Sequence, residues 1–373
     1  MMNRRQFMAT GAVAGIGVAG GLALRWFRSA EHAYEEAVQR TWRPIKNDPA
    51  APDARMRELV RYAALAPSSH NTQCWRFRIG ERSISMLPDL QRRCPAVDPD
   101  DHHLFVSLGC AAENLLQAAA AMGLHGDPVF NTGADDVLDV ALEPMKALQS
   151  PLYEAIIRRQ STRTEFDGKP LSNDDLRLLE AAGTGNGVRV ELITEPRAMA
   201  AVLDFVVQGN TTQMRAPAFV RELKQWMRFN GAQAAKSGDG LFSACSGNPT
   251  GPDWLGSRMF DLFFKEKSEN DKYARQVRSS AGIAVFVSEV DDKAHWVKAG
   301  RAFERFALQA TALGIRNAHL NQPVEVASLR PEFASSIGVV SGRPDLVIRF
   351  GRGPEMLRSL RRPVETMLVQ ESV

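Results

Sequence analysis

The stretch Ser107-Leu-Gly-Cys-Ala-Ala-Glu-Asn-Leu-Leu-Gln-Ala-Ala-Ala-Ala-Met-Gly-Leu124 has a weak copy later in the chain, Lys298-Ala-Gly-Arg-Ala-Phe-Glu-Arg-Phe-Ala-Leu-Gln-Ala-Thr-Ala-Leu-Gly-Ile315. Six of the eighteen aligned positions are identical: Gly109/Gly300, Ala111/Ala302, Glu113/Glu304, Ala119/Ala310, Ala121/Ala312 and Gly123/Gly314. Both are Ala-rich helix patterns that end at Gly, which suits a left-handed C-terminal cap. Small residues on both helices allow a close approach. We therefore expect them to form a central pair that joins two repeated halves.

The pattern around these helices predicts an α+β fold in two tandem halves. The first half covers residues 50–147 and the second covers 148–373, with strands expected at 75–79, 83–87, 137–142, 188–194, 282–288 and 346–350. Helices and strands alternate without regular βαβ spacing, which favours α+β. An aromatic-rich insertion, residues 214–279, separates two strands of the second half and is expected to be a helical lid or an extension packed on the core.

The segment Ala66-Pro-Ser-Ser-His-Asn-Thr-Gln-Cys-Trp75 predicts a polar turn after a helix. Asn71 and Gln73 stand two residues apart, and each amide offers both donors and acceptors of hydrogen bonds. Such groups suit a ligand that presents both donors and acceptors of hydrogen bonds. Ser69 and His70 belong to the same turn and are included among the candidate binding residues.

A second segment, Arg158-Arg-Gln-Ser-Thr-Arg163, predicts a phosphate site. Arg159, Ser161 and Arg163 alternate, so an extended backbone aims all three to one side. Guanidinium groups bind phosphate oxygens in a bidentate way, and a hydroxyl adds a compact donor. Gln160 lies within the same run.

Together these two segments resemble the nitroreductase-like flavoproteins, in particular their double-domain, Acg-like branch. In that superfamily a Pro-Ser-x-x-Asn-x-Gln-Pro-Trp segment and an Arg-Arg-Ser-x-Arg segment close over one FMN from different subunits. The resemblance implies a nitroreductase-like fold, one FMN between two halves of a single chain, and two-electron transfer by the flavin. It also implies that Arg361-Arg362-Pro363 supplies a basic residue to the phosphate, and that Asn317, His319 and Asn321 run along the flavin ring. Two residues depart from the pattern: Cys74 replaces Pro, and Gln160 replaces a second Arg.

Residues 1–30 have the pattern of a bacterial twin-arginine (Tat) export signal. Arg4-Arg5 stands in a basic segment, and an apolar, Gly-rich run from Ala9 to Leu24 follows. This run is shorter than the ~20 residues of a stable membrane span. No clear small-x-small cleavage site follows it, so a membrane tether remains open. We expect a periplasmic or exported protein.

Composition and minor motifs exclude several other functions. The net charge of +3 is too small to favour nucleic-acid binding. The run Asp98-Pro-Asp-Asp-His-His103 fits the start of a helix better than a metal site, and no metal is expected. The four cysteines have no CxxC spacing, which favours buried thiols over a disulfide, and the sequence selects no pair.

The sequence therefore predicts an exported, monomeric FMN-dependent oxidoreductase that reduces a small oxidised acceptor such as a nitro compound or a quinone. The flavin carries the chemistry, so no side chain is expected to act as a catalytic acid or base. The electron donor, NAD(P)H or another, stays open. The alternative is a non-catalytic protein that binds or sequesters FMN behind a closed lid, and a cofactor-free structural relic is a third hypothesis.

Overall fold

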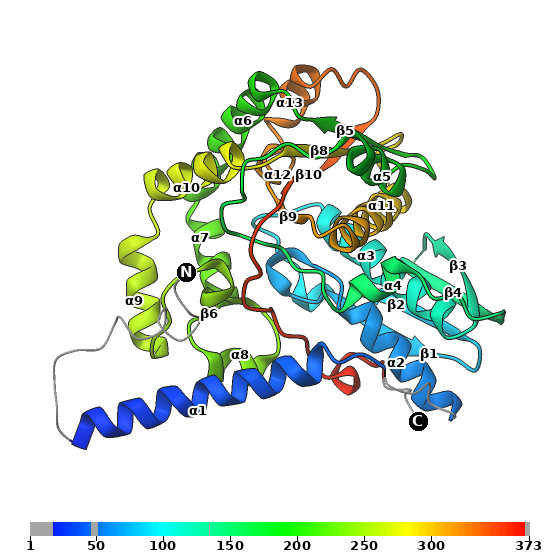
Figure 1. The fold of residues 1–373 in the computed structure, drawn as a ribbon, viewed down its shortest axis with the longest axis horizontal. Helices are drawn as coiled ribbons and strands as arrows, with labels where there is room; N and C mark the ends of the chain where they lie inside the picture. The colour runs from blue at the N-terminus through cyan, green and yellow to red at the C-terminus, as the bar shows by residue number, and fades with distance from the viewer. Residues whose placement is uncertain (1–17, 46–50, 134, 370–373) are drawn as a thin grey trace.

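The computed structural model describes residues 18–45, 51–133 and 135–369. Two four-stranded antiparallel sheets form its framework (Figure 1). The first has the order β1-β2-β4-β3 and contains β1 (Trp75–Ile79), β2 (Ser83–Pro88), β3 (Leu124–Asn131) and β4 (Val137–Pro144). The second has the order β5-β8-β10-β9 and contains β5 (Val188–Ile193), β8 (Gly282–Ser288), β9 (Arg316–His319) and β10 (Arg343–Gly351).

The two halves have the same plan. In each, a helix precedes the first two strands, a long helix follows them, and two more strands complete the sheet. The helices are α2 (Pro52–Ala64) and α3 (His102–Ala121) in the first half, and α5 (Asn173–Gly183) and α11 (Lys293–Ala312) in the second. Because the strand orders also correspond, the repeat seen between the two Ala-rich stretches extends to the whole architecture.

Helices α3 and α11 form the central pair that the sequence predicts, side by side in the middle of the molecule (Figure 1). Two glycines permit their contact. A Cβ atom on Gly109 would lie 2.0 Å from the Val297 carbonyl oxygen, and one on Gly300 would lie 1.9 Å from that of Val106. Real atoms do not approach so closely, so both positions require glycine. The Cys110 thiol donates to the Gly300 carbonyl across the same contact, at 3.3 Å.

The two sheets differ in what covers them. The first packs one face on the central helices, and its strands β3 and β4 alternate between less and more exposed residues. The second is covered on both faces: every residue of β8 and β10 is buried. Its outer face packs under α6 (Pro196–Arg215), α10 (Glu266–Arg278), α12 (Gln322–Glu325) and α13 (Arg330–Ser336).

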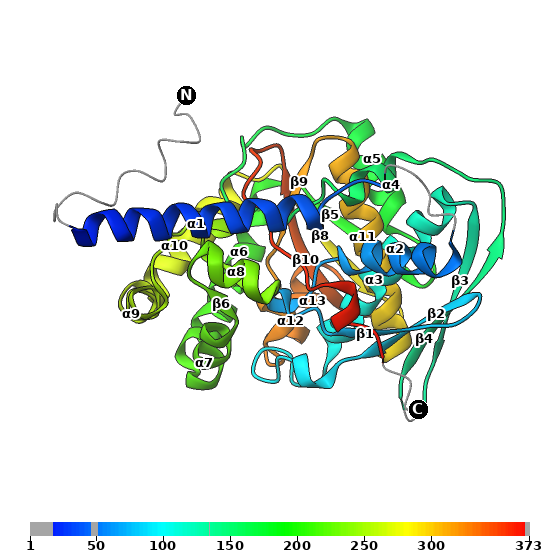
Figure 2. The ribbon, with the colours of Figure 1, turned by 90° about the horizontal axis from the view of Figure 1, so that it is seen from below.

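The insertion between β5 and β8 is longer than expected and begins at Pro196 rather than at Met214. After α6 it contains α7 (Pro217–Trp226), β6 (Met227–Arg228), α8 (Gly231–Ser237), β7 (Leu241–Phe242), the 3-10 helix η3 (Ser243–Ser246), α9 (Asp253–Phe263) and α10. Helices α6 and α10 extend the core, whereas α7 contacts residues 69–71 of the first half and α8 packs on the N-terminal helix (Figure 2). The expected core extension therefore describes α6 and α10, and the expected lid over a flavin stays a prediction.

The N-terminal helix α1 (Val18–Thr41) runs along one side of the molecule and packs on α8 (Figure 2). The Tyr34 hydroxyl donates to the Arg358 carbonyl oxygen at 2.6 Å, and Ala30 and Ala37 are also buried. The expected boundary at residue 30 therefore falls within a helix that docks on the body. The twin arginines lie outside the described residues.

The sequence patterns missed two strands of the four-stranded sheets, β3 and β9, and the two-residue strands β6 and β7. Strand β3 contains Gly126 and Pro128, which read as turn residues, but β3 is an edge strand, where a Pro needs no ladder partner. Strand β9 is four residues long and also lies at an edge. The remaining elements are α4 (Pro151–Ile156) and the 3-10 helices η1 (Ser69–Asn71), η2 (Leu90–Arg92) and η4 (Val364–Thr366).

Among the described residues one helix, α3, is long and apolar enough to cross a bilayer. It is the buried centre of the fold, with 83% of its apolar window inside the protein. Its apolar character therefore reflects core packing. All four cysteines are buried and form no disulfide, which agrees with the prediction of buried thiols.

Candidate functional site

The turn between α2 and β1 has an unusual backbone. His70, Asn71 and Gln73 have φ angles of 47°, 54° and 54°, in the left-handed region that residues other than glycine rarely adopt. The Ser68 hydroxyl accepts from the Gln73 backbone N–H at 2.9 Å and holds the turn closed. Such strain costs of order 1–3 kcal/mol per residue and concentrates at functional sites.

The amides of Asn71 and Gln73 bind other segments of the chain. Asn71 Nδ2 donates to the carbonyl oxygens of Gly240 at 3.0 Å and Leu360 at 3.2 Å. Gln73 Nε2 donates to the Gly238 carbonyl oxygen at 2.9 Å, and Gln73 Oε1 accepts from the Arg362 backbone N–H at 2.8 Å. The turn thus joins the insertion to the C-terminal segment, and these bonds occupy amide groups that the sequence assigns to a cofactor.

The segment after α4 lies along the edge strand β9. Thr162 N donates to the Asn317 carbonyl oxygen at 2.9 Å, and Ser161 forms a parallel bridge to the same residue. The Arg349 guanidinium donates to the carbonyl oxygens of Thr162 and Thr164, each at 2.8 Å. The structure therefore brings the segment 159–163 from the start of the second half against its last strands.

Arg159 and Gln160 have protein partners. Arg159 is buried and pairs with Glu304 of α11, with Nε 3.0 Å from Oε1, and it also donates to the Leu65 carbonyl oxygen at 3.0 Å. The Gln160 side chain makes two bonds to the backbone of Met356: Oε1 accepts at 2.7 Å and Nε2 donates at 3.2 Å. Gln160 thus fastens the C-terminal segment, a role that its sequence position does not reveal.

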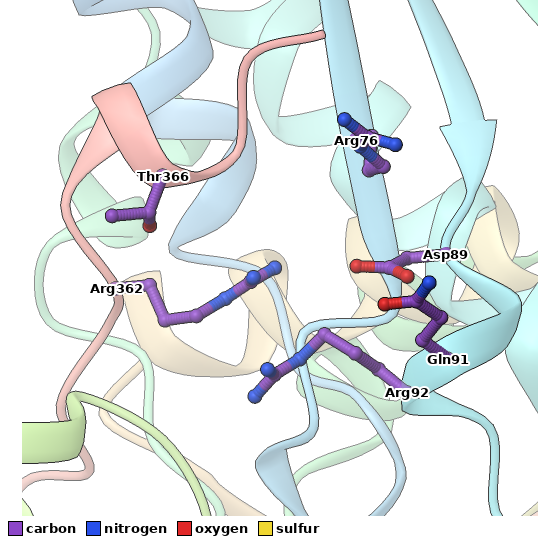
Figure 3. A pocket seen from close by; sticks show the side chains of 6 residues that line it. All are labelled: Arg76, Asp89, Gln91, Arg92, Arg362 and Thr366. Carbon is purple, nitrogen blue, oxygen red and sulfur yellow. The ribbon is translucent and has the colours of Figure 1, made fainter.

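Arg361 binds the beginning of the α2–β1 connection, and Arg362 binds its end. The Arg361 guanidinium donates to the carbonyl oxygens of Ala64, Leu65 and Ala66 at 2.8–3.0 Å. Arg362 donates instead to the Gln73 carbonyl oxygen at 2.7 Å. It lines a pocket of about 370 Å³, shown in Figure 3, together with Arg76, Asp89, Gln91, Arg92 and Thr366. The two arginines are adjacent in the sequence, but their side chains therefore bind different parts of the structure.

Arg163 is the exception among these basic side chains. Its guanidinium has no ion pair or hydrogen bond among the described residues, and desolvation by burial lowers its pKa. Desolvation also lowers the pKa of His70 to about 4 and that of His319 to about 3, and the positive charge of Arg163 adds to both shifts. All three residues nevertheless keep some accessible surface. These three side chains therefore lie near one another, desolvated but not fully enclosed.

Several buried polar atoms of these residues and their neighbours lack partners within the described part of the chain. They are His70 Nε2, both amide atoms of Asn317, His319 Nδ1 and Gln322 Oε1. An unsatisfied buried polar group costs about 1–3 kcal/mol, so such a concentration calls for a ligand or water. Of the three residues that the resemblance places along a ring, Asn317 and His319 fit this description. Asn321 does not, because its Oδ1 accepts from Val347 N at 3.0 Å.

Three further residues of the site escaped the sequence analysis. Tyr273 of α10 and Cys245 of η3 lie close enough to Arg163 for its charge to affect their pKa values, although desolvation is the largest cause of both upward shifts. Glu304 was noted only as one of the repeated positions. Burial raises its pKa to about 7 despite the nearby guanidinium of Arg159. Tyr273 and Cys245 belong to the insertion. No local sequence motif predicts that the insertion lies near the site.

The Asp98–His103 run behaves as the helix-start interpretation expects. The Asp98 carboxylate accepts from the backbone N–H groups of His103 and Leu104, each at 3.0 Å, at the start of α3. His102 and Asp345 form a buried pair, with 2.9 Å between Nε2 and Oδ1. Asp98, His102 and His103 lie close enough to share an ion, but these bonds already explain their positions.

Comparisons with known proteins extend over most of the chain. No family model matches it. It is similar to a Mycobacterium tuberculosis protein that bears the provisional name NAD(P)H nitroreductase, with 26% identity over 311 residues, covering 81% of this chain and 87% of that protein. The M. tuberculosis protein acg, whose name is equally provisional, is 22% identical over 327 residues, covering 83% of this chain and 94% of that protein.

Solved structures give weaker likenesses. The FMN-dependent nitroreductase NfnB from Mycobacterium smegmatis, in complex with NADPH, aligns at 13% identity and a TM-score of 0.36, covering 60% of this chain and 94% of NfnB. A nitroreductase with bound FMN from Bacteroides fragilis aligns at 15% identity and a TM-score of 0.34, covering 60% of this chain and 95% of that one.

Proposed function

We propose that this protein is an FMN-dependent oxidoreductase of the nitroreductase type, with one flavin site per chain. The observation that carries the proposal is Arg163, a desolvated guanidinium without an anionic partner in the described part of the chain. A buried, unpaired charge is costly, and an anionic ligand beside it recovers that cost. The curated relatives, provisionally named NAD(P)H nitroreductases, support the same class of ligand and of electron donor.

The residues around Arg163 fit a flavin. Asn317 offers an unpaired amide donor and acceptor, and the free Nδ1 of His319 adds a further polar atom. An isoalloxazine edge presents both donors and acceptors, so this mixed set suits it better than it suits a simple anion. The positive charge of Arg163 favours an electron-rich, reduced ring. Ser161 has a hydroxyl without a partner among the described residues, so Ser161 and Arg163 are the residues of the 159–163 segment whose side chains remain to meet an anionic group.

FMN held here would supply two-electron redox chemistry toward an oxidised acceptor such as a nitro compound or a quinone. The protein's own groups hold the ring, set its electronics through Arg163, and limit access of water through the insertion. No side chain needs to act as a general acid or base.

Replacing Arg163 tests this proposal. R163Q should weaken FMN binding by about one to two orders of magnitude, because it removes hydrogen bonds from a charged donor that are each worth roughly 1.5–3 kcal/mol. The same change should leave the flavin-free protein equally stable or more stable, since it removes an unpaired buried charge. Fluorescence titration with FMN and urea denaturation measure the two effects.

The matched control is R158Q, at the exposed neighbouring arginine. It should change neither property. Wild-type protein should bind one FMN per chain and remain a monomer by light scattering with size-exclusion chromatography. Equal FMN affinity in R163Q and wild type, or two FMN per chain, would contradict the assignment.

A flavin-sequestering protein is the second candidate, and one observation favours it. The insertion hydrogen-bonds directly to the strained turn, through Gly238 and Gly240 to the amides of Gln73 and Asn71. A cover fixed in this way would restrict access of substrates. Steady-state reduction of a quinone or a nitro compound with NADPH as the only donor separates the two: turnover supports the oxidoreductase, and tight FMN binding without turnover supports sequestration.

We also propose that the protein is exported by the Tat route and rests against a membrane. The twin arginines and the apolar run 9–24 support this, and helix α9 adds a second contact. Its residues Trp254, Leu255, Met259, Leu262 and Phe263 are all exposed, from 39% to 64%. In both views α9 lies at the same end of the molecule as the start of α1 (Figures 1 and 2).

Two changes separate export from membrane contact. R4K/R5K should retain the protein in the cytoplasm, because twin arginines are read as an address rather than as charge. W254S/F263S should leave export intact and reduce flotation with lipid vesicles. Unchanged export in the first variant would indicate a general secretory signal or a simple anchor.

A further inference from the structure

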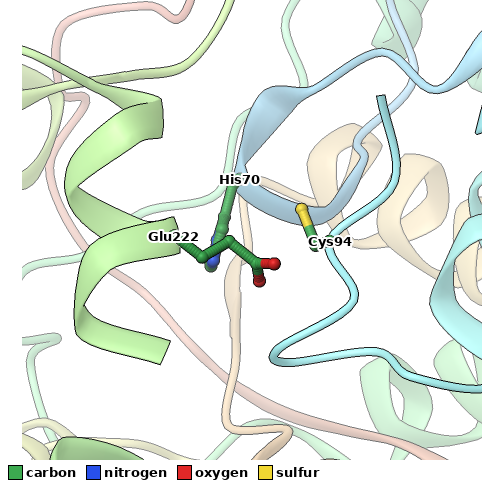
Figure 4. A group of neighbouring side chains, drawn as sticks. All are labelled: His70, Cys94 and Glu222. Atoms are coloured by element: carbon green, nitrogen blue, oxygen red, sulfur yellow. The ribbon is translucent and has the colours of Figure 1, made fainter. Parts of the chain in front are cut away.

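Three metal-ligating side chains from three different elements converge beside the strained turn. Figure 4 shows His70 of η1, Cys94 after η2, and Glu222 of α7 directed toward one another. One ligand atom from each lies within 4.8 Å of the others. Nothing in the flavin chemistry requires Cys94 or Glu222, so the cluster is a separate feature of the fold.

The state of each side chain favours an ion rather than simple packing. Cys94 is 3% exposed, and its thiol makes no hydrogen bond within the residues that the structure describes. His70 Nε2 is buried without a partner. The Glu222 carboxylate accepts from Ala96 N at 2.8 Å and Val97 N at 3.2 Å, which fixes its orientation and leaves lone pairs on both oxygens.

Solvent reaches the cluster through a groove. A pocket of about 460 Å³ is lined by Glu222 and by Pro95 and Ala96, the two residues that follow Cys94. Trp226 and Ala218 of α7 border the same pocket. An ion therefore has an access path to the carboxylate, and a water molecule has room beside it.

We propose that His70, Cys94 and Glu222 bind one zinc ion. Nitrogen, sulfur and oxygen donors together are the ligand set that zinc takes in proteins, and three protein ligands leave a fourth position for water from the groove. The thiol gives up its proton on binding, so a thiolate, a carboxylate and a neutral imidazole balance the two positive charges of the ion. Zinc bonds of 2.0–2.3 Å place tetrahedral ligand atoms roughly 3.3–3.8 Å apart, so the side chains need to close by at most about 1.5 Å.

Such a site would tie the insertion to the turn. Glu222 belongs to α7, whereas His70 lies in the α2–β1 connection beside Arg163. In the other cluster of possible ligands, Asp98 with His102 and His103, all three residues are buried, and the Asp98 carboxylate and His102 Nε2 already have hydrogen-bond partners. The zinc proposal does not depend on FMN, because it uses contacts that exist without a cofactor.

The test uses the full-length protein, stripped with a chelator and titrated with Zn²⁺ and with Co²⁺. We expect one ion per chain and, with Co²⁺, the near-ultraviolet charge-transfer band of a cobalt–thiolate bond. C94S should abolish that band, and C94S and E222Q should each lower Zn²⁺ affinity by at least tenfold. C110S, which removes a different buried thiol, should behave as wild type.

Absence of the thiolate band in wild type, or equal Zn²⁺ affinity in all four proteins, would overturn the proposal and indicate adventitious surface binding. Circular dichroism of each variant shows whether it is folded, and E222Q keeps the test valid if C94S is not. FMN titration of the stripped protein is read separately, so loss of the zinc site and loss of the flavin site are distinguishable.

Discussion

The two halves share a strand order but differ in the connection between the first helix and the first strand. In the first half, residues 65–74 separate α2 from β1, and three of them adopt left-handed conformations. In the second half, only residues 184–187 separate α5 from β5. The longer connection meets the segment 159–163 and the insertion, whereas the shorter one makes a tight turn. The repeated scaffold is therefore symmetric, and its candidate site is not.

The repeated glutamates show the same contrast within the central helices. Glu113 and Glu304 are both almost fully buried. Glu113 pairs with Arg301 and Arg305, two residues of the facing helix, at 3.2 and 3.1 Å. Glu304 pairs instead with Arg159, which comes from outside the helix pair and opens the 159–163 segment. One glutamate holds the scaffold together and its counterpart anchors the site, which is how a fold supports function through residues added to it.

The first prediction concerns the symmetric part, where we expect the largest effect. G300V should destabilise the protein by about 3 kcal/mol or more, because a side chain there would meet the backbone of α3 and force the central helices apart. The loss should be visible as a lower urea midpoint for the whole chain. G133A is the control, since nothing lies within 4 Å of a Cβ atom at that position. Similar midpoints in the two variants would show that the helix contact is looser than the structure indicates.

The second prediction uses Glu304 and pH. The carboxyl has a pKa of about 7 in the fold against 4.5 as the ordinary value, so the folded state holds a proton that the unfolded state has released between these values. Stability from this group is present below pH 4.5 and is lost as pH rises through 7, by about 3 kcal/mol. E304Q should therefore show a weaker fall in stability between pH 5 and 8.

Asp345 contributes in the same direction, because burial raises its pKa to about 7. Some pH dependence should therefore persist in E304Q and diminish further in E304Q/D345N. Urea denaturation at pH 5, 6, 7 and 8 measures it. The same slope in wild type and E304Q would place the ionisation of Glu304 outside this range.

Most of the framework could be predicted from the sequence because its signals are local or repeated. The Ala-rich helices carry their own caps and small residues, and the strand pattern locates β1, β2, β4, β5, β8 and β10. Strand β3 could not be recognised, since Gly126 and Pro128 are acceptable only at an edge, and edges are set by the tertiary fold. The full extent of the insertion also depended on packing, because α6 covers a sheet face formed by distant strands.

The sequence predicted which segments form the candidate site better than it predicted the hydrogen bonds and ion pairs within it. The sequence placed Arg163 and His70 among the binding residues, with Asn317 and His319 beside them. The structure brings them near one another: the charge of Arg163 lowers the pKa of both histidines, and Ser161 forms a bridge to Asn317. The sequence could not show that the amides of Asn71 and Gln73 hold Gly238 and Gly240, or that Arg159 meets Glu304. Those partners lie between 145 and 169 positions away in the chain, so no local pattern encodes them.

The smallest loss of stability should come from a substitution in the α2–β1 connection. N71A removes two hydrogen bonds that join the turn to Gly240 and Leu360, at a cost of about 1–2 kcal/mol. Because one of these bonds holds the insertion, cleavage by trypsin after Lys236 should accelerate before global stability falls markedly, and FMN binding should weaken several-fold. T184A, at an exposed position in the short connection of the other half, should change neither rate nor affinity. If both variants resist trypsin equally, the insertion is held over the site by contacts other than Asn71, and the asymmetry between the halves would rest on the insertion rather than on the turn.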